Sequence, residues 1–481
     1  MTVVEFGTDG IRGKAGVWPI SAEGALQIGL GLGAYLRGRS AAPAVVIGRD
    51  TRLSGAALAA GLAAGLLSRG VQVIDVGVIT TAGVAFLARH HQLDAGVVIS
   101  ASHNPWQENG IKVIGGDGFK PPEEMERGIE AKIAEVIAGG PGEEAVFGVL
   151  EHRPDWVDEY IAFLVKPFKP GMLAGMKVAV DCGNGAASAI AGRCFDLLGC
   201  TTTILNAAPD GVNINDGGGS EHVRNGSAAL YEVVTKGGLD FGVAFDGDAD
   251  RAVFVDETGQ MRDGDHILYI LGRYLRSRGL LAGDMVVTTV MANSGLDLAL
   301  QQEGMRTLRT KVGDKYIVRE MQAHGYVVGG EQSGHILIFT DADHTTGDGI
   351  FTALYVASIL AEDRGQTLSQ LAAPVIKLPQ VVASAHVRTK PDLGSIAELE
   401  QARAEALAEL GEGITINTRY SGTEPVFRAM IEGQAGHTLA QVARHALRLC
   451  RAVQAAGGYP DGPVEVKNTT TGSLIDLSEI A

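Results

Sequence analysis

The sequence predicts a multidomain α/β protein with three similar mixed α/β domains, a smaller C-terminal α+β domain and one central cleft. Three observations support this prediction. The chain has 481 residues, enough for three or four domains. A strand–helix pattern occurs three times, and after about residue 370 it gives way to a different one. Hydrophobic residues make up 46% of the chain, and its 66 glycines lie between apolar runs, which suits large cores and tight strand–helix turns.

Each repeat contains three apolar runs that have the length and composition of strands. Roughly 20 to 40 residues separate the strand starts, which is the spacing that crossovers between parallel strands need. The recurrence indicates internal duplication, with domains expected at 1–151, 152–253 and 254–370. The runs are 45–48, 71–76 and 94–99, then 177–180, 201–205 and 239–245, then 285–290, 306–308 and 325–328.

The C-terminal part follows another pattern. LPQVVASAHVRT alternates like a strand with one exposed face, and residues 391–410 and 438–456 have helical composition. These elements, with two strands around RYSGTEP, predict an α+β domain over 371–456. Residues 457–481 begin with turn residues and are polar, so we expect a flexible or partner-docking tail of unknown role.

Charge and composition exclude several classes of protein. The net charge is 40 − 56 = −16, which argues against a nucleic-acid or anionic-membrane surface. The four cysteines have neither metal-ligand nor disulfide-framework spacing, which favours a reducing compartment. The N-terminus does not resemble a signal peptide, and the apolar run 56–67 is too short to span a membrane. We therefore expect a cytoplasmic protein without nucleic-acid or membrane partners.

The third strand of each repeat leads into a polar loop: SASHN, DGDADR or GGEQSGH. Ligands bind at the carboxyl ends of strands in α/β sheets, so these loops are expected to share one cleft. In the first loop, Ser102 is either an exposed nucleophile or a turn hydroxyl, and the residues alone leave both readings open. Ser102 and His103 are not a hydrolase pair, because adjacent side chains rarely face each other and no G-x-S-x-G surrounds them.

The second loop predicts a metal site. Asp246, Asp248 and Asp250 stand at alternate positions, and two carboxylates about 4 Å apart repel by roughly 4 kcal/mol at an effective dielectric near 20. A cation would offset this repulsion, and Mg²⁺ is favoured over Ca²⁺ because few protein ligands leave room for a phosphate oxygen. An EF-hand is rejected, since Arg251 stands where that loop needs glycine and strands flank the motif. An acidic turn without metal is the alternative.

Three further stretches can bind an anion or a sugar. RYSGTEPVFR offers two guanidinium groups and two hydroxyls beside a glycine, which suits phosphate, although a solvated turn is the alternative. FGTDGIRG adds Arg12, and GGEQSGH carries groups that can hydrogen-bond sugar hydroxyls or an amine. His335 taken alone would be structural. The candidates are Arg419, Ser421, Gly422, Thr423 and Arg428, and Glu331, Ser333 and His335.

Taken together and in this order, the motifs resemble those of the α-D-phosphohexomutase family over about residues 4–456. Within that family, Gln332 of GGEQSGH is typical of the glucosamine branch. FGTDGIRG, RTKVGDKY and DHTTGDG are also similar to the glucosamine enzymes.

The resemblance implies an isomerase that interconverts glucosamine 6-phosphate and glucosamine 1-phosphate. Ser102 would be a phosphoserine, and Ser102 with the three aspartates would hold Mg²⁺. A 1,6-bisphosphate intermediate would form and turn end for end, and glucosamine or glucose 1,6-bisphosphate would act as activator. His103 and Lys112 would be the acid/base candidates, with Arg12 and Arg251 stabilising the phosphoryl group. The loop 419–428 would clamp the other phosphate, and a homodimer is a further expectation.

Three departures limit this resemblance. Trp106 replaces a smaller aromatic, Glu221 stands where threonine is more usual, and the chain continues past residue 456. A phosphoglucomutase/phosphomannomutase of relaxed specificity is the alternative enzyme. A non-catalytic sugar-phosphate sensor is disfavoured, because Ser102, the three aspartates and the arginines are all present.

Overall fold

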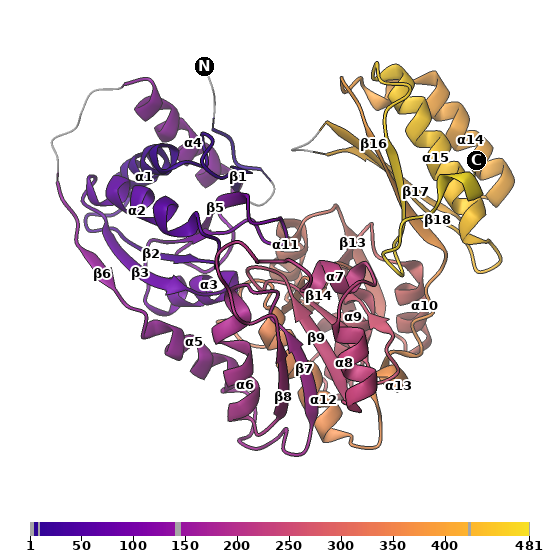
Figure 1. The fold of residues 1–481 in the computed structure, drawn as a ribbon, viewed down its shortest axis with the longest axis horizontal. Coiled ribbons are helices and arrows are strands. Elements are labelled where there is room, and N and C mark those ends of the chain that lie inside the picture. The colour runs from indigo at the N-terminus through magenta and orange to yellow at the C-terminus, as the bar shows by residue number, and fades with distance from the viewer. Residues whose placement is uncertain (1–3, 8–9, 140–145, 422–424, 481) are drawn as a thin grey trace.

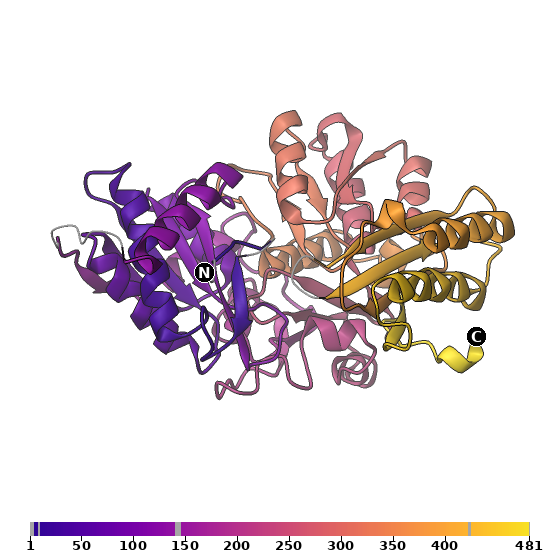
Figure 2. The same cartoon turned by 90° about the horizontal axis from the view of Figure 1, so that it is seen from above.

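The computed structural model describes residues 4–7, 10–139, 146–421 and 425–480. Its strands form four sheets, each built from one consecutive stretch of the chain. The first and C-terminal domains lie at opposite ends, with the second and third between them (Figures 1 and 2).

The first three sheets share one topology. In each sheet, three parallel strands lie side by side, and the first of them in the chain is in the middle. A fourth strand runs antiparallel next to the third. This recurring order supports the predicted duplication. The strands are β2 (Ala44–Arg49), β3 (Gln72–Val78), β4 (Ala95–Ile99) and β5 (Glu108–Gly115); β7 (Lys177–Asp181), β8 (Thr201–Leu205), β9 (Phe241–Phe245) and β10 (Ala252–Asp256); and β12 (Met285–Thr289), β13 (Arg306–Thr310), β14 (Val328–Gly330) and β15 (Ile336–Ile338).

Short strands extend the first two sheets. β1 (Ile11–Lys14) and β6 (Leu150–His152) are the edges of the first sheet, and β11 (Met261–Arg262) is an edge of the second. Because β10 and β11 belong to the second sheet, the predicted boundary between residues 253 and 254 falls inside β10.

Glycine lets α1 (Ala22–Arg37) and α2 (Gly55–Leu67) pack at very short range. A Cβ on Gly29 would lie 2.2 Å from the carbonyl oxygen of Leu62, and one on Gly65 would lie 2.4 Å from that of Leu26. Alanine at either position would therefore push the helices apart. Part of the high glycine content thus serves helix packing, in addition to the strand–helix turns that the composition predicts.

One hydrophobic cluster spans the first three domains, and each of them also has a smaller cluster of its own. The shared cluster of buried side chains runs from Ile74 of the first domain through Phe245 of the second to Phe351 of the third. Tyr160 joins them by a buried hydrogen bond of 2.8 Å from its hydroxyl to Asp348. The helices of these domains are α3 (Thr81–His90), α4 (Glu123–Ile137), α5 (Trp156–Val165), α6 (Ala191–Leu197), α7 (Ser220–Arg224), α8 (Leu230–Gly237), α9 (Gly264–Ser277), α10 (Ser294–Gln302), α11 (Asp314–His324), α12 (Gly349–Glu362) and α13 (Leu368–Ala372).

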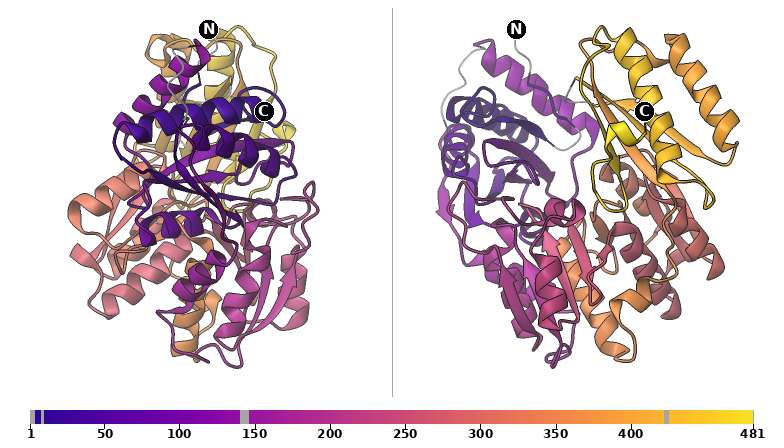
Figure 3. Two further views of the ribbon diagram at one scale, coloured as in Figure 1. Left: turned by 90° about the vertical axis from the view of Figure 1, so that its left-hand side faces the viewer. Right: turned by 45° about the vertical axis from the view of Figure 1, so that its right-hand side comes forward.

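The C-terminal domain has a separate core. Its antiparallel sheet has the order β17-β18-β16-β19, covered by α14 (Ala397–Leu410) and α15 (Leu439–Ala456). Figure 3 shows this domain facing the first domain above the other two. The strands are β16 (Gln380–His386), β17 (Thr415–Tyr420), β18 (Val426–Glu432) and β19 (Val464–Asn468).

Two expectations for this domain need correction. The α-helix expected at 391–410 begins only at Ala397, after a short 3-10 helix at Leu393–Ser395. The tail is not simply flexible, because β19 pairs with β16 and buries Val464 and Val466 in the domain core.

Among the residues that the structure describes, no helix combines the length and the apolar character needed to cross a bilayer.

The role of the tail in the core can be measured. Val466 is 1% exposed, so Val466→Ala should destabilise the C-terminal domain by about 1–3 kcal/mol through lost burial and the cavity left behind. Leu474→Ala, at a position 65% exposed, should cost less than about 0.5 kcal/mol. Hydrogen exchange of the β16 amides measures the loss of stability in both variants. Equal protection in the two variants would contradict a structural role for β19.

Candidate active site

Ser102 lies in the loop after β4, with its hydroxyl aimed at the second domain. Its Oγ donates to Oδ2 of Asp246 at 2.6 Å and lies 3.3 Å from Nδ1 of His103. The residue is fully buried, and its φ of +53° is in the left-handed region, which is unfavourable for a non-glycine residue. Such a conformation persists only when neighbours hold it, which is common at functional sites.

Two side chains hold this loop. The buried guanidinium of Arg52 donates to the carbonyl oxygens of Ser102 at 3.0 Å and Asn104 at 2.7 Å, and it pairs with Asp50 at 2.9 Å. Asn215 of the second domain donates to the same two carbonyls at 2.9 and 3.1 Å. Sequence reasoning missed these residues. Asp50 and Arg52 follow β2 at the same edge as Ser102, so the strand-end rule could have found them.

The three aspartates form a compact buried cluster between β9 and β10. One carboxylate oxygen from each lies within 4.8 Å of the others. Within the described part of the chain, Oδ1 of Asp248 and Oδ1 of Asp250 are buried without a hydrogen-bond partner. Burial, followed by the charges of Asp250 and Asp248, raises the pKa of Asp246 well above its usual range. The cluster therefore needs a cation, and its hard oxygen donors fit Mg²⁺.

Cationic side chains from the first and third domains approach the cluster. Lys112 donates to Oδ2 of Asp248 at 2.7 Å, with both side chains buried. The ring of His335 lies 3.6 Å from Asp250 and 3.4 Å from Asp314. Burial opposes its charge, but these two carboxylates raise the pKa of His335 to about 10. His335 therefore lies beside carboxylates of the second and third domains, and its expected contact with a sugar stays a prediction.

Arg251 connects the aspartates to the serine loop. Its Nη1 donates to Nδ1 of His103 at 3.1 Å, and its Nε lies 3.9 Å from Asp246 and 3.8 Å from Asp250. Burial, then the charges of Arg251 and Arg12 on β1, lower the pKa of His103 to about 3, although nearby carboxylates oppose this. His103 is therefore neutral, with Nδ1 as an acceptor.

In the third-domain loop, Glu331 and Ser333 hydrogen-bond within the third domain, whereas Gln332 also contacts the C-terminal domain. Glu331 accepts from the backbone N–H of Gly313 at 3.2 Å and from the Ser333 hydroxyl at 3.4 Å. Gln332 is buried and donates to Asp265 at 3.4 Å and to Gln380 at 3.5 Å. The residue typical of the glucosamine branch therefore faces the connection to the C-terminal domain.

The C-terminal domain contributes two adjacent arginines. Arg419 of β17 is the direct cross-strand neighbour of Arg428 of β18. Burial and the charge of Arg428 lower the pKa of Arg419, while Glu331 opposes the shift. Two neighbouring guanidinium groups favour an anionic ligand. Ser421 is buried, and its carbonyl accepts from Lys390 at 2.7 Å. Gly422 and Thr423 lie outside the described residues.

These interactions connect the four domains. His103 of the first domain contacts Arg251 of the second, and Asp250 of the second faces His335 of the third. Glu331 of the third domain influences the pKa of Arg419 in the fourth. A metal-fitting cluster, a hydroxyl beside it and an arginine pair are therefore brought to one region, a set of groups suited to phosphoryl chemistry.

Comparisons with known proteins match this arrangement. Four family profiles describe phosphoglucomutase/phosphomannomutase: alpha/beta/alpha domains I, II and III match residues 3–138, 158–259 and 263–378, and the C-terminal domain matches 384–449. The phosphoglucosamine mutase of Symbiobacterium thermophilum is 45% identical over 89% of this chain and 94% of that protein. The phosphoglucosamine mutase of Desulforudis audaxviator is 46% identical over 92% of this chain and 97% of that protein.

Solved structures show the same fold. A phosphoglucomutase/phosphomannomutase family protein from Burkholderia thailandensis superposes with a TM-score of 0.76 at 26% identity, covering 95% of this chain and 98% of that one. The N-acetylphosphoglucosamine mutase of Aspergillus fumigatus, in complex with GlcNAc-6P and magnesium, has a TM-score of 0.62 at 18% identity, covering 95% and 96%. The expected family and fold class are confirmed.

The Arg52 clamp yields a prediction for stability and rate. Arg52→Ala removes the donors to the serine loop and leaves Asp50 buried without its partner, so it should cost about 3–5 kcal/mol in the free energy of unfolding. Arg49→Ala, at the last residue of β2, breaks a partly exposed pair with Asp75 and should cost at most about 1 kcal/mol. The free energy of unfolding, from denaturant titration, and the turnover number are measured for both variants. Equal losses would contradict the clamp.

Proposed function

The chain belongs to the phosphoglucomutase/phosphomannomutase family, and we propose that it interconverts glucosamine 6-phosphate and glucosamine 1-phosphate. The observation that carries this proposal is the buried Ser102 hydroxyl, held 2.6 Å from Asp246 in the cluster that fits Mg²⁺. Relatives at 45% and 46% identity over most of the chain are phosphoglucosamine mutases, which supports the choice of sugar.

In the active enzyme Ser102 carries the phosphoryl group as phosphoserine. The loop clamp fixes its backbone, so the group on Oγ points toward the three aspartates. When bound between those carboxylates, Mg²⁺ neutralises charge on the phosphoryl oxygens and lowers the barrier to transfer. The orphaned oxygens of Asp248 and Asp250 are available to hold it.

The transfer step breaks the bond between Ser102 Oγ and phosphorus while a bond forms from phosphorus to a sugar oxygen. The proton of that sugar hydroxyl moves to a base. His103 and Lys112 are the two candidates for this base, and the group that accepts the proton returns it to the sugar oxygen in the reverse step. Arg251 and Arg12 supply positive charge beside the moving group.

A second phosphate site makes the reaction an isomerisation. The 1,6-bisphosphate must turn end for end, so the enzyme needs a fixed site for whichever phosphate is not reacting. Arg419 and Arg428 supply the guanidinium groups of that site. Ser421, Gly422 and Thr423 stay predicted members of it. Glu331 and Ser333 lie between the two phosphate sites and bind the sugar, with the Glu331 carboxylate suited to an amine.

Further properties follow from the same proposal. A chain whose Ser102 is unphosphorylated needs a phosphoryl donor, and glucosamine or glucose 1,6-bisphosphate would fill this role as activator. The cytoplasmic location and the homodimer stay predictions.

Competition between sugars tests the reaction. Purified protein with Mg²⁺ and equal concentrations of glucosamine 6-phosphate and glucose 6-phosphate should convert the glucosamine compound with the higher kcat/KM, by about tenfold or more, because the Glu331 carboxylate can form an ion pair with the amine but not with a hydroxyl. Chelation of the metal should abolish both reactions, and added Mg²⁺ should restore them. Faster conversion of glucose 6-phosphate would identify the relaxed phosphoglucomutase/phosphomannomutase instead.

The phosphoserine has its own test. The intact mass of the active protein should exceed that of the unmodified chain by one phosphoryl group, mapped to the peptide 98–112. Ser102→Ala should lose at least about 10³-fold in kcat because the transferred group has no carrier, whereas binding of glucosamine 6-phosphate should stay within about twofold. Ser100→Ala is the matched control and should keep the added mass. Turnover by Ser102→Ala at the wild-type rate would exclude the covalent route.

A further inference from the structure

The C-terminal tail ends in a hairpin that belongs to the C-terminal domain. β19 runs along β16, the chain reverses over residues 468–473, and the returning backbone of Ile475 donates to the carbonyl of Val466 at 2.8 Å. Gly472, with φ of +69°, closes the turn by donating to the carbonyl of Asn468 at 2.8 Å. The family profiles end at residue 449, so they assign no role to this segment.

The tip of this turn touches the second domain. A Cβ on Gly472 would lie 1.3 Å from the carbonyl oxygen of Arg224 at the end of α7, so only glycine fits there. A Cβ on Gly226 would lie 3.8 Å from the carbonyl oxygen of Thr471. The backbones of the two domains therefore meet directly at this place.

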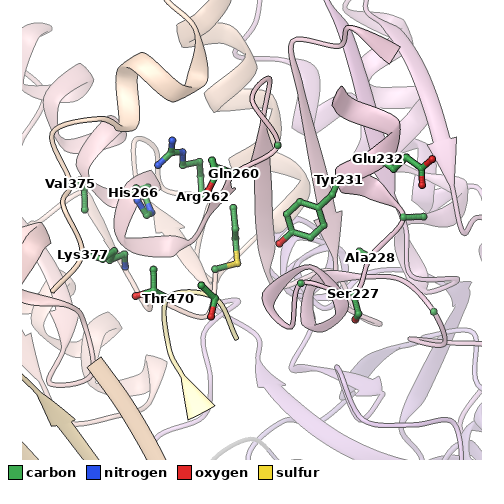
Figure 4. A pocket seen from close by; sticks show the side chains of 16 residues that line it. Ser227, Ala228, Tyr231, Glu232, Gln260, Arg262, His266, Val375, Lys377 and Thr470 are labelled. Carbon is green, nitrogen blue, oxygen red and sulfur yellow. The ribbon is translucent and has the colours of Figure 1, made fainter. Parts of the chain in front are cut away.

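Beside the tip lies a cavity of about 780 Å³, lined by residues of the second domain, the third domain and the turn. Thr470 and Thr471 of the turn form part of its lining, with Lys377 on the third-domain side and Tyr231 on the second-domain side (Figure 4). The contact is thus narrow, and it can release without disrupting a packed core.

Charged side chains connect the place where the tail docks with the active site, although Lys467 and Arg224 there carry like charges. Lys467 of β19 is half-buried, and burial and the charge of Arg224 lower its pKa while Glu221 opposes the shift. Glu221 pairs with Arg224 at 2.9 Å and lies 3.8 Å from Arg251. The helix that receives the tail therefore also carries the carboxylate beside the active-site arginine.

The tail is also joined to the connection between the third and C-terminal domains. The Thr469 hydroxyl donates to the side-chain oxygen of Gln380 at 2.6 Å, and the Gln380 amide donates to Glu432 at 3.1 Å. The C-terminal domain has its own core, so this connection and the tail tip are two of the places that fix its orientation.

We propose that the 468–473 turn is a docking element that seats the C-terminal domain on α7 and so positions Arg419 and Arg428 over the substrate. This inference rests on the proposed function, in which those arginines hold the non-reacting phosphate. Release of the narrow contact lets the domain lift while the bisphosphate turns, and reseating restores the clamp.

A matched pair of glycine variants tests the proposal. Gly472→Ala places a methyl group against the Arg224 carbonyl and should raise KM for glucosamine 6-phosphate about fivefold or more, with kcat within about twofold, because binding to the clamp is what weakens. Gly458→Ala is the control: it lies in the same tail with φ of +72° but has open space around it, so it should leave KM unchanged. Equal KM values for the two variants would overturn the proposal.

Disulfide trapping gives a readout that does not depend on catalysis. The four native cysteines are buried, so cysteines introduced at Gly226 and Thr471 can be cross-linked selectively. The disulfide should form readily without substrate, and about tenfold more slowly when Gly472→Ala is added. It should lower kcat until a reducing agent breaks it, because a fixed domain prevents reorientation of the bisphosphate. Failure to cross-link, or full turnover in the cross-linked protein, would contradict docking. If the protein turned over no hexose phosphate, trapping would still decide whether the turn docks, so the two failures are distinguishable.

Discussion

The structure depends on three buried carboxylates held within 4.8 Å of one another. The positive groups of Lys112, Arg251 and His335 lie beside them and offset part of their mutual repulsion. The carboxylate oxygens that remain unpaired are suited to a divalent cation. These groups come from all of the first three domains, because each parallel sheet ends its third strand near the same region. The Ser102 hydroxyl is directed at the cluster from the first domain. The relative placement of the domains would therefore bring together the metal and the phosphoryl carrier of the proposed reaction.

The need to hold Ser102 beside the three aspartates explains why the first three domains pack together while the C-terminal domain folds separately. One hydrophobic cluster spans the first three domains and holds the serine and the aspartates in a fixed relation. The C-terminal domain has its own core and carries the arginine pair. A bisphosphate that must turn between two half-reactions requires a fixed transfer site and a phosphate clamp that can release it. In our proposal, the contact of the tail with α7 is the one that releases.

The sequence predicts the centre of the site better than its surroundings. Ser102, the three aspartates and Glu331 follow strand ends, so strand periodicity locates them before any contact is known. Arg52 also follows a strand end, so its position could have been found, but the sequence does not show that it binds the carbonyls of the serine loop. Asn215 binds the same carbonyls from a loop distant in sequence, and no local pattern indicates such a partner. The tail looks flexible because Val464 and Val466 become buried only against the edge of β16. Gln332 follows the family motif, yet its contacts show that it faces the domain connection.

The central claim is that one hexose phosphate touches groups from all four domains around a single metal ion. A crystal structure with glucosamine 6-phosphate, and with Mn²⁺ in place of Mg²⁺ to give an anomalous signal, tests it most directly. The account predicts one anomalous peak coordinated by Asp246, Asp248 and Asp250, next to Oγ of Ser102, with the phosphate of the bound sugar on Arg419 and Arg428. A metal peak away from the aspartates, or a sugar that leaves the arginine pair in a separate cavity, would contradict it.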